Sequence, residues 1–210
     1  MDAHDWDERY AAADLVWSAG PNQFVSAHLA ALPPGRALDL ATGEGRNALW
    51  LADRGWQVTA VDFSRAGLDK ARALQSGHAR SQALRIEWVH ADVLTYAAGA
   101  GCYDLSLIAY LQLPADSRRA AVRRGFDALR VGGTLFVVGH DSSNLADGTG
   151  GPQDPAVLFT AGDVLDDLDG TRFDVARAGR VPRTVRAADE HGGEPERTAY
   201  DALVELVRTG

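Results

Sequence analysis

Hydrophobic positions along this chain form short runs that alternate with amphipathic segments. Five of the runs are predicted to be strands: Arg36 to Leu40, Val58 to Val61, Ile86 to His90, Tyr103 to Tyr110 and Thr134 to Val138. Three segments between them are predicted to be helices: Asn47 to Arg54, Arg65 to Gln75 and Pro114 to Arg130, the last closed by Gly132 and Gly133. Strands that alternate with helices predict a parallel, doubly wound sheet.

The pattern changes after residue 140. Residues 141–157 are rich in Gly, Pro and Asp and are predicted to form a long loop. Thr160 and Asp163 have the spacing of a capping box and predict a short helix through about Leu168. Two strand-like runs follow, Phe173 to Arg186 and Thr198 to Arg208, around a hairpin tip at residues 189–193. We therefore predict an α/β fold: a doubly wound, mostly parallel, seven-stranded Rossmann-like sheet that ends in an antiparallel C-terminal hairpin.

Composition limits the classes of protein that fit. A chain of 210 residues with 46% apolar content is expected to form one domain over residues 1–210, with a helical cap at 1–32 and the core at 33–210. No apolar run is long enough to span a membrane, and the polar N-terminus does not resemble a signal peptide. The single cysteine, Cys102, suits a reducing cytoplasm and is interpreted as inert packing.

Charge argues against a nucleic-acid partner. The formal net charge is −8, whereas phosphate contacts require clustered Lys and Arg. One basic cluster is present, at Arg118, Arg119, Arg123 and Arg124, and its helical spacing predicts a solvated helix face. The sequence also shows no pattern that predicts a metal site, and it does not indicate an oligomeric state.

The segment from residue 36 to 62 predicts a nucleoside-binding unit. The first strand ends at a tight turn with Gly43 and Gly45, a helix follows, and the second strand ends in Asp62. This βαβ half-unit commonly binds an adenosine. The spacing Gly43-x-Gly45-x-x-Ala48, with Asp62 downstream, also satisfies the dinucleotide fingerprint, so an NAD(P)-dependent reductase is an alternative.

Acidic residues around the turn favour a different cofactor. Asp39 lies in the strand before the turn and Glu44 lies within it. A diphosphate is bound by backbone N–H groups without a competing anion, whereas carboxylates favour a cationic ligand. S-adenosylmethionine carries an ammonium and a sulfonium, and its ribose hydroxyls suit Asp62. Arg46 partly offsets these acids, and Asp39 has the alternative role of bonding backbone N–H groups of the turn.

The segment Leu38 to Asn47 resembles the first motif of class I S-adenosylmethionine-dependent methyltransferases. It includes the Gly-x-Gly-Arg-Asn variant of the small-molecule subgroup with tellurite-resistance and thiopurine-type enzymes, with Thr42 where that subgroup usually has cysteine. The resemblance covers about residues 6 to 208. It implies that the turn holds the methionine portion, Asp62 the ribose and Asp92 the adenine. The implied cofactor-binding residues are Asp39, Ala41, Gly43, Gly45, Arg46, Asn47, Asp62, Phe63, Asp92, Val93 and Ala109.

Ligands of doubly wound sheets lie beyond the carboxyl ends of the strands. Tyr110 and His140 end two strands there and are the candidate catalytic residues. His140 is predicted to be a general base, or alternatively to hydrogen-bond the following loop. The candidate substrate-binding residues are Trp6, Tyr10, Asp141 and Arg183. Trp17 is a weaker candidate of the same kind.

These observations predict a cytoplasmic methyltransferase that modifies a heteroatom (S, Se, Te, N or O) of a small molecule. Arg183-Thr184 resembles an Arg-Thr element of tellurite-resistance enzymes, but Pro182 replaces the histidine that precedes it there, and the hairpin tip is acidic. Both differences weaken a prediction of tellurite or selenite as acceptor. A cofactor-binding regulatory module without catalysis is the non-enzymatic alternative.

Overall fold

A computed structural model describes residues 3–12, 15–16, 20–185 and 196–210 of the chain. Trp17 and the predicted hairpin tip at residues 189–193 lie outside the described residues. Within the described residues, no helix is both long and apolar enough to cross a bilayer.

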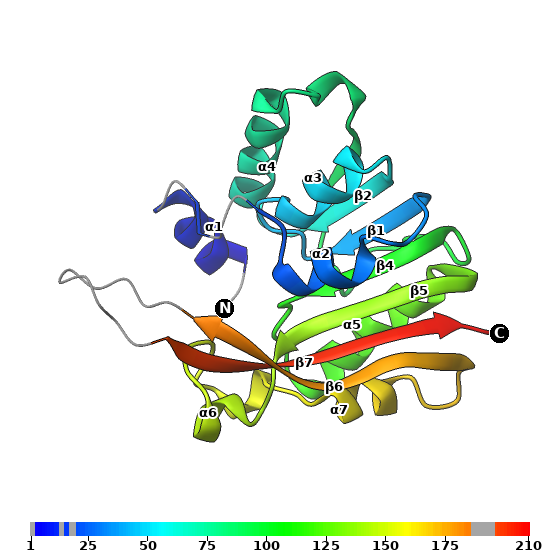
Figure 1. Ribbon diagram of the computed structural model, residues 1–210. Coiled ribbons are helices and arrows are strands. Elements are labelled where there is room, and N and C mark those ends of the chain that lie inside the picture. Colours follow the sequence, from blue (N-terminus) through cyan, green and yellow to red (C-terminus); the bar gives the residue numbers. More distant parts are fainter. Residues whose placement is uncertain (1–2, 13–14, 17–19, 186–195) are drawn as a thin grey trace.

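A seven-stranded sheet forms the centre of the molecule, in the order β3-β2-β1-β4-β5-β7-β6 (Figure 1). The strands are β1 (Arg36–Leu40), β2 (Gln57–Asp62), β3 (Arg85–His90), β4 (Tyr103–Ala109), β5 (Leu129–His140), β6 (Phe173–Val185) and β7 (Arg197–Arg208). Strands β1 to β5 pair in parallel, and β7 is antiparallel to both β5 and β6. The predicted α/β fold, with its mostly parallel sheet and antiparallel C-terminal hairpin, is confirmed.

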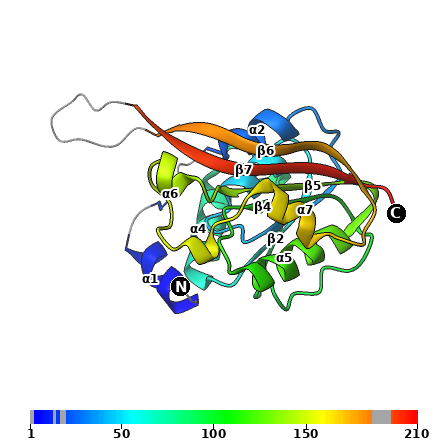
Figure 2. The same cartoon turned by 90° about the horizontal axis from the view of Figure 1, so that it is seen from below.

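Helices cover both faces of the sheet (Figure 2). They are α1 (Ala3–Ala11), α2 (Gln23–Leu29), α3 (Arg46–Asp53), α4 (Arg65–Gly77), α5 (Ala115–Asp127), α6 (Asn144–Asp147) and α7 (Ala161–Asp167). Alternate residues of β1 enter two separate apolar clusters: Leu38 and Leu40 pack with residues of α5 and α7, and Ala37 packs with residues of α2 and α3. This period of two is what a strand buried on both faces requires.

The start of β5 differs from the prediction. Helix α5 ends at Asp127 and β5 begins at Leu129, so Gly132 and Gly133 lie inside the strand instead of closing the helix. The ladder between β4 and β5 shifts register after Tyr103, and Gly132 adopts a φ of +82° there. The two glycines therefore lie at a register shift between paired strands. Their local sequence alone does not distinguish this role from the end of a helix.

Two further predictions are corrected by the packing of the C-terminal half. Residues 141–157 contain helix α6 and a single helical turn at Pro155–Val157, so they are not one unstructured loop. Arg118 is not on a solvated face: it is 8% exposed, and its Nε donates to Asp167 Oδ2 at 2.7 Å. Helix α7 packs on α5, and Arg118 therefore forms a buried ion pair with Asp167 although its spacing predicts an exposed position.

Candidate functional site

The turn after β1 is held by hydrogen bonds to β2. Thr42 N donates to the Val61 carbonyl oxygen at 3.0 Å, and Gly43 N donates to Asp62 Oδ2 at 2.7 Å. Gly45 forms the N-cap of α3 with a φ of +77°, and a Cβ there would collide with the Trp88 ring. Only glycine tolerates both conditions, which explains the second glycine of the motif.

Asp62 organises this turn. It is buried, and its Oδ1 accepts a hydrogen bond from Ser64 N at 2.8 Å while Oδ2 accepts the one from Gly43. Burial raises the pKa of Asp62, and these backbone N–H groups oppose that shift. Each carboxylate oxygen has a second lone pair, so both retain capacity for a ligand hydroxyl. The turn-bonding role that the sequence left open for Asp39 belongs to Asp62.

Asp39 is the most buried acid of the turn. Its side chain is 1% exposed, and Oδ2 accepts a hydrogen bond from Thr42 Oγ1 at 2.7 Å. Burial raises the pKa of Asp39 to about 7, against the effect of the Thr42 hydrogen bond and with the help of the nearby Asp62 charge. A cation placed beside this carboxyl would favour its ionised form.

Two other polar residues of the motif hold the N-terminal segment. Both Glu44 oxygens lie 3.1 Å from Val16 N, and Lys70 Nζ lies 3.3 Å from Oε1. Asn47 Oδ1 accepts a hydrogen bond from Asn22 N at 2.9 Å. Glu44 therefore contributes to chain packing, and the charge argument for a cationic ligand rests on Asp39.

The other residues predicted to bind the cofactor follow β2, β3 and β4. Phe63 is half-buried, and its carbonyl oxygen accepts a hydrogen bond from His90 Nε2 at 2.9 Å. Asp92 is exposed, and its Oδ1 accepts a hydrogen bond from Leu94 N at 2.8 Å, which is a local turn. Val93 is buried in an apolar cluster, and Ala109 is half-buried at the end of β4. Cofactor binding by these residues stays a prediction.

A second polar cluster lies where β4 and β5 end, and its centre is Asp201 of β7. Asp201 is fully buried, and its Oδ2 accepts hydrogen bonds from Tyr110 Oη at 2.9 Å and from Arg183 Nε at 2.7 Å. Burial raises the pKa of Tyr110, helped by the Asp201 charge. Asp201 was not predicted from the sequence. The available signal was an acid inside an apolar strand run, between Tyr200 and Ala202.

His140 lies beside this cluster. Its ring centroid is 5.0 Å from that of Tyr110, and its Nδ1 is 3.5 Å from Asp201 Oδ1. Burial lowers the pKa of His140, although the Asp201 charge raises it. The ring packs against Gly151, and Nδ1 forms no hydrogen bond, so the alternative in which this atom holds the following loop is not seen. Asp141 Oδ1 accepts hydrogen bonds from Ser143 N and Oγ at 2.9 and 2.6 Å.

Helix α1 docks on the N-terminus of α4, next to Asp62. Asp7 Oδ1 accepts a hydrogen bond from Ser64 Oγ and another from Ala66 N at 3.1 Å. Tyr10 is buried against Gly67, and its ring centroid lies 5.4 Å from that of Trp6. The docking role of Asp7 was not predicted from the sequence. Substrate binding by Trp6 and Tyr10 stays a prediction.

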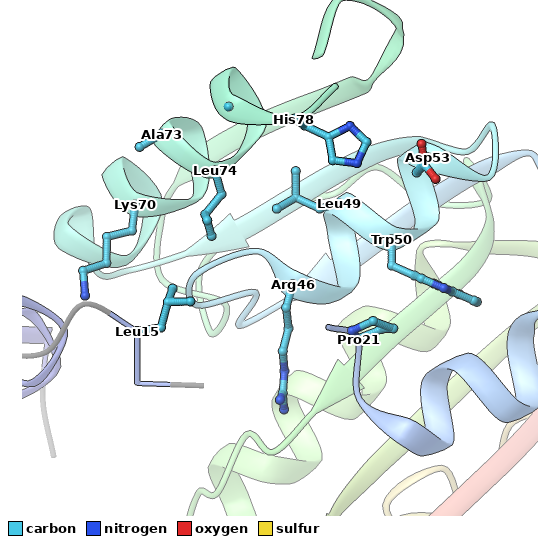
Figure 3. Close-up of a pocket in the computed structure, with 11 residues that line it drawn as sticks. Leu15, Pro21, Arg46, Leu49, Trp50, Asp53, Lys70, Ala73, Leu74 and His78 are labelled. Atoms are coloured by element: carbon cyan, nitrogen blue, oxygen red, sulfur yellow. The ribbon is translucent and has the colours of Figure 1, made fainter. Parts of the chain in front are cut away.

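A cavity of about 650 Å³ lies between α3 and α4 (Figure 3). Its lining includes Leu49, Trp50 and Leu74, and Arg46 is the one predicted site residue among the lining residues. The Arg46 side chain points away from Leu74. Burial lowers the pKa of Arg46, and Tyr110 and Asp39 oppose this shift. Arg46 therefore lies within electrostatic range of Asp39 and of Tyr110.

Comparison with known proteins gives a domain family and a set of related folds. Residues 37–133 match a family described as "Methyltransferase domain". A search of curated proteins gave no match to this chain. Among solved structures, the N-methyltransferase NodS from Bradyrhizobium japonicum WM9, in complex with S-adenosyl-l-homocysteine, has a TM-score of 0.72 at 18% identity and covers 100% of both chains.

Two other structures are similarly related. A protein solved in work on the conversion of a disulfide bond into a thioacetal group during echinomycin biosynthesis has a TM-score of 0.73 at 19% identity, covering 99% of this chain and 92% of its own. TehB from Haemophilus influenzae has a TM-score of 0.71 at 17% identity, covering 90% of this chain and 63% of its own. The resemblance inferred from the motif is confirmed: residues 37–133 are a methyltransferase domain, in a chain with the fold of S-adenosylmethionine-dependent methyltransferases.

Proposed function

We propose that this methyltransferase transfers the methyl group of S-adenosylmethionine to a heteroatom (S, Se, Te, N or O) of a small molecule, in the cytoplasm. The observation that carries the proposal is the pair of buried carboxyls, Asp39 and Asp62, on either side of the glycine turn. The structure of NodS in complex with S-adenosyl-l-homocysteine supports S-adenosylmethionine as the cofactor.

The choice of cofactor follows from charge. A diphosphate beside Asp39 would face a carboxyl whose ionised form burial already disfavours. A sulfonium or an ammonium at the same place would instead stabilise that ionised form. This difference favours S-adenosylmethionine over the nicotinamide alternative.

Methyl transfer requires mainly that the reacting atoms are aligned. The sulfonium is an activated leaving group, so the rate depends on holding nucleophile, methyl carbon and sulfur in line and on excluding water. We assign cofactor binding to the turn and to the carboxyl ends of β1 to β4. We assign the acceptor to the side of Tyr110, His140, Asp141 and Arg183, closed by Trp6 and Tyr10 of α1. The net charge of −8 favours a small acceptor over a nucleic acid.

Isothermal titration of the full chain with S-adenosylmethionine, S-adenosylhomocysteine and NAD tests the proposal. We expect the first two to bind and NAD not to bind, and binding of NAD alone would refute the proposal. Asp62→Ala should weaken S-adenosylmethionine at least tenfold, about 1.4 kcal/mol. Asp69→Ala, an exposed acid on α4 that pairs with Arg72, is the matched control and should leave affinity unchanged. Thermal melts identify any variant that fails to fold.

A measurement of turnover distinguishes an enzyme from a regulatory module that only binds the cofactor. A panel of thiol, amine and hydroxyl acceptors incubated with S-adenosylmethionine should release S-adenosylhomocysteine with at least one class. A module that only senses the cofactor would bind it and release none of the product with every acceptor in the panel.

A further inference from the structure

We propose that Asp201 is a positioning residue that keeps the His140 proton on Nδ1, so that Nε2 is the base that receives the proton of the methyl acceptor. The inference rests on the proposed function and deepens it. It concerns a residue that lies outside the matched methyltransferase domain, on β7, the last strand in the sequence.

The sheet register brings the two side chains together. His140 of β5 is directly opposite Asp201 of β7 in the antiparallel ladder, so both side chains project from the same face. Nδ1 of His140 lies 3.5 Å from Asp201 Oδ1. This distance exceeds that of a good hydrogen bond, but such contacts often shorten when a substrate binds.

Nδ1 is the nitrogen that needs a partner. It is buried and has no hydrogen bond, while 13% of the His140 side chain is still exposed. The backbone of Gly151 covers the ring closely, since a Cβ at that residue would lie 2.7 Å from Nδ1. A buried N–H without an acceptor costs free energy, and Asp201 Oδ1 is the acceptor within reach.

The other contacts of Asp201 leave Oδ1 available. Oδ2 accepts hydrogen bonds from Tyr110 Oη and Arg183 Nε, whereas Oδ1 has only the longer contact with Arg183 Nη2, at 3.4 Å. The guanidinium supplies the opposite charge that a buried carboxylate requires. The groups that face the His140 ring are therefore Asp201 from β7, Arg183 from β6 and the Tyr110 phenol that follows β4.

The proposed step transfers the methyl group to the acceptor and the acceptor proton to His140. The lone pair of the acceptor heteroatom forms a bond to the methyl carbon, and the carbon–sulfur bond breaks with its electron pair going to sulfur. The products are the methylated acceptor and S-adenosylhomocysteine. The proton of the acceptor moves to Nε2 of His140, the Asp201 carboxylate stabilises the imidazolium, and the proton then passes to solvent.

The tautomer of His140 can be measured in the free protein. Long-range ¹H–¹⁵N correlation spectra of the full chain, labelled at histidine and recorded near neutral pH, distinguish a proton on Nδ1 from one on Nε2. We expect the wild-type protein to carry it on Nδ1. A proton on Nε2 in the wild type would overturn the proposal.

Asp201→Asn should move the proton from Nδ1 to Nε2. Arg183 and Tyr110 both donate at the position of Oδ2, so the amide oxygen must occupy it. The amide NH₂ then faces Nδ1, which has to become an acceptor. A variant that keeps the wild-type tautomer contradicts the proposal. If this variant does not fold, the wild-type spectrum alone decides.

Two controls complete the experiment. Asp147→Asn, an exposed acid that pairs with Arg180, should leave the His140 tautomer unchanged. Titration of the same samples with S-adenosylmethionine should give equal affinity for wild type and Asp201→Asn, whereas a tenfold loss in the variant would place Asp201 in cofactor binding and overturn its assignment. Failure of the wild type to bind S-adenosylmethionine refutes the proposed function, and the tautomer spectra test the Asp201 assignment independently.

Discussion

Replacing Asp39 by Asn should change how the stability of this protein depends on pH. Asp39 lies beneath the glycine turn, buried and with one side-chain hydrogen bond, from Thr42. Burial raises the pKa of its carboxyl from the ordinary value of 3.8 to about 7. The folded protein therefore binds this proton more tightly than the unfolded chain does.

The sign and size of the effect follow from proton linkage. Between pH 4 and 7 the unfolded chain loses the proton while the folded protein keeps it, so stability falls as pH rises through this window. Each pH unit costs about 1.4 kcal/mol, and the full shift of about three units corresponds to about 4 kcal/mol. Asn cannot titrate, so the variant lacks this loss. The stability of Asp39→Asn relative to wild type should therefore rise with pH by up to about 4 kcal/mol.

Urea denaturation of the ligand-free protein, followed by tryptophan fluorescence at several pH values from 4 to 8, measures this difference. The constant offset between the two proteins depends on whether the amide still accepts the Thr42 hydrogen bond, but the slope does not. Asp69→Asn, an exposed acid on α4, is the control and should give a curve parallel to wild type. If the Asp39→Asn curve is also parallel to wild type, the carboxyl does not titrate in this range. The inferred rise in the pKa of Asp39 would then be wrong.

Two other substitutions test the fold around the site. Arg118→Ala should lower the free energy of unfolding in urea by about 3 kcal/mol, because it removes the closest guanidinium from the buried Asp167 carboxylate. Arg124→Ala, exposed on the same helix, should cost less than about 0.5 kcal/mol, and equal losses would contradict the buried pair. Gly45→Ala should cost at least about 1 kcal/mol in the same assay, because its backbone is left-handed and a Cβ collides with Trp88; an unchanged midpoint would refute this strain.

The fold around the proposed cofactor site could be predicted because its signals are local. The strand β1, the turn and α3 follow one another without interruption, and the glycines mark backbone that other residues adopt only with strain. The acid at the end of β2 is equally visible, since it follows the strand directly. Periodicity and turn chemistry over about 25 residues therefore predict both this part of the fold and its chemistry.

The roles of individual acids could not be predicted, because they depend on contacts far apart in sequence. Glu44 lies in the turn, yet its carboxylate accepts a hydrogen bond from Val16 N in the N-terminal segment. Asp62 lies at the end of the next strand, yet it is the acid that accepts a hydrogen bond from the turn, at Gly43 N. Asp201 is 61 residues beyond His140 in the sequence (201 − 140), and only the β5–β7 register makes them neighbours. A pattern of hydrophobic positions predicts strands but does not reveal which residues of two paired strands are opposite each other.

The two halves of the site also differ in where their residues come from. The match to the methyltransferase domain ends at residue 133, after the turn, Asp62, Asp92 and Tyr110 but before His140, Arg183 and Asp201. An in-line displacement needs the acceptor on the side of the methyl group opposite to sulfur, so the groups that select the acceptor have to face the cofactor across the carboxyl ends of the strands. We propose that in this chain these groups include His140 at the end of β5 and Arg183 of β6, together with Tyr110 after β4. We therefore expect acceptor specificity to depend on strands that lie partly outside the matched domain, while the glycine turn and its buried carboxyls bind the cofactor.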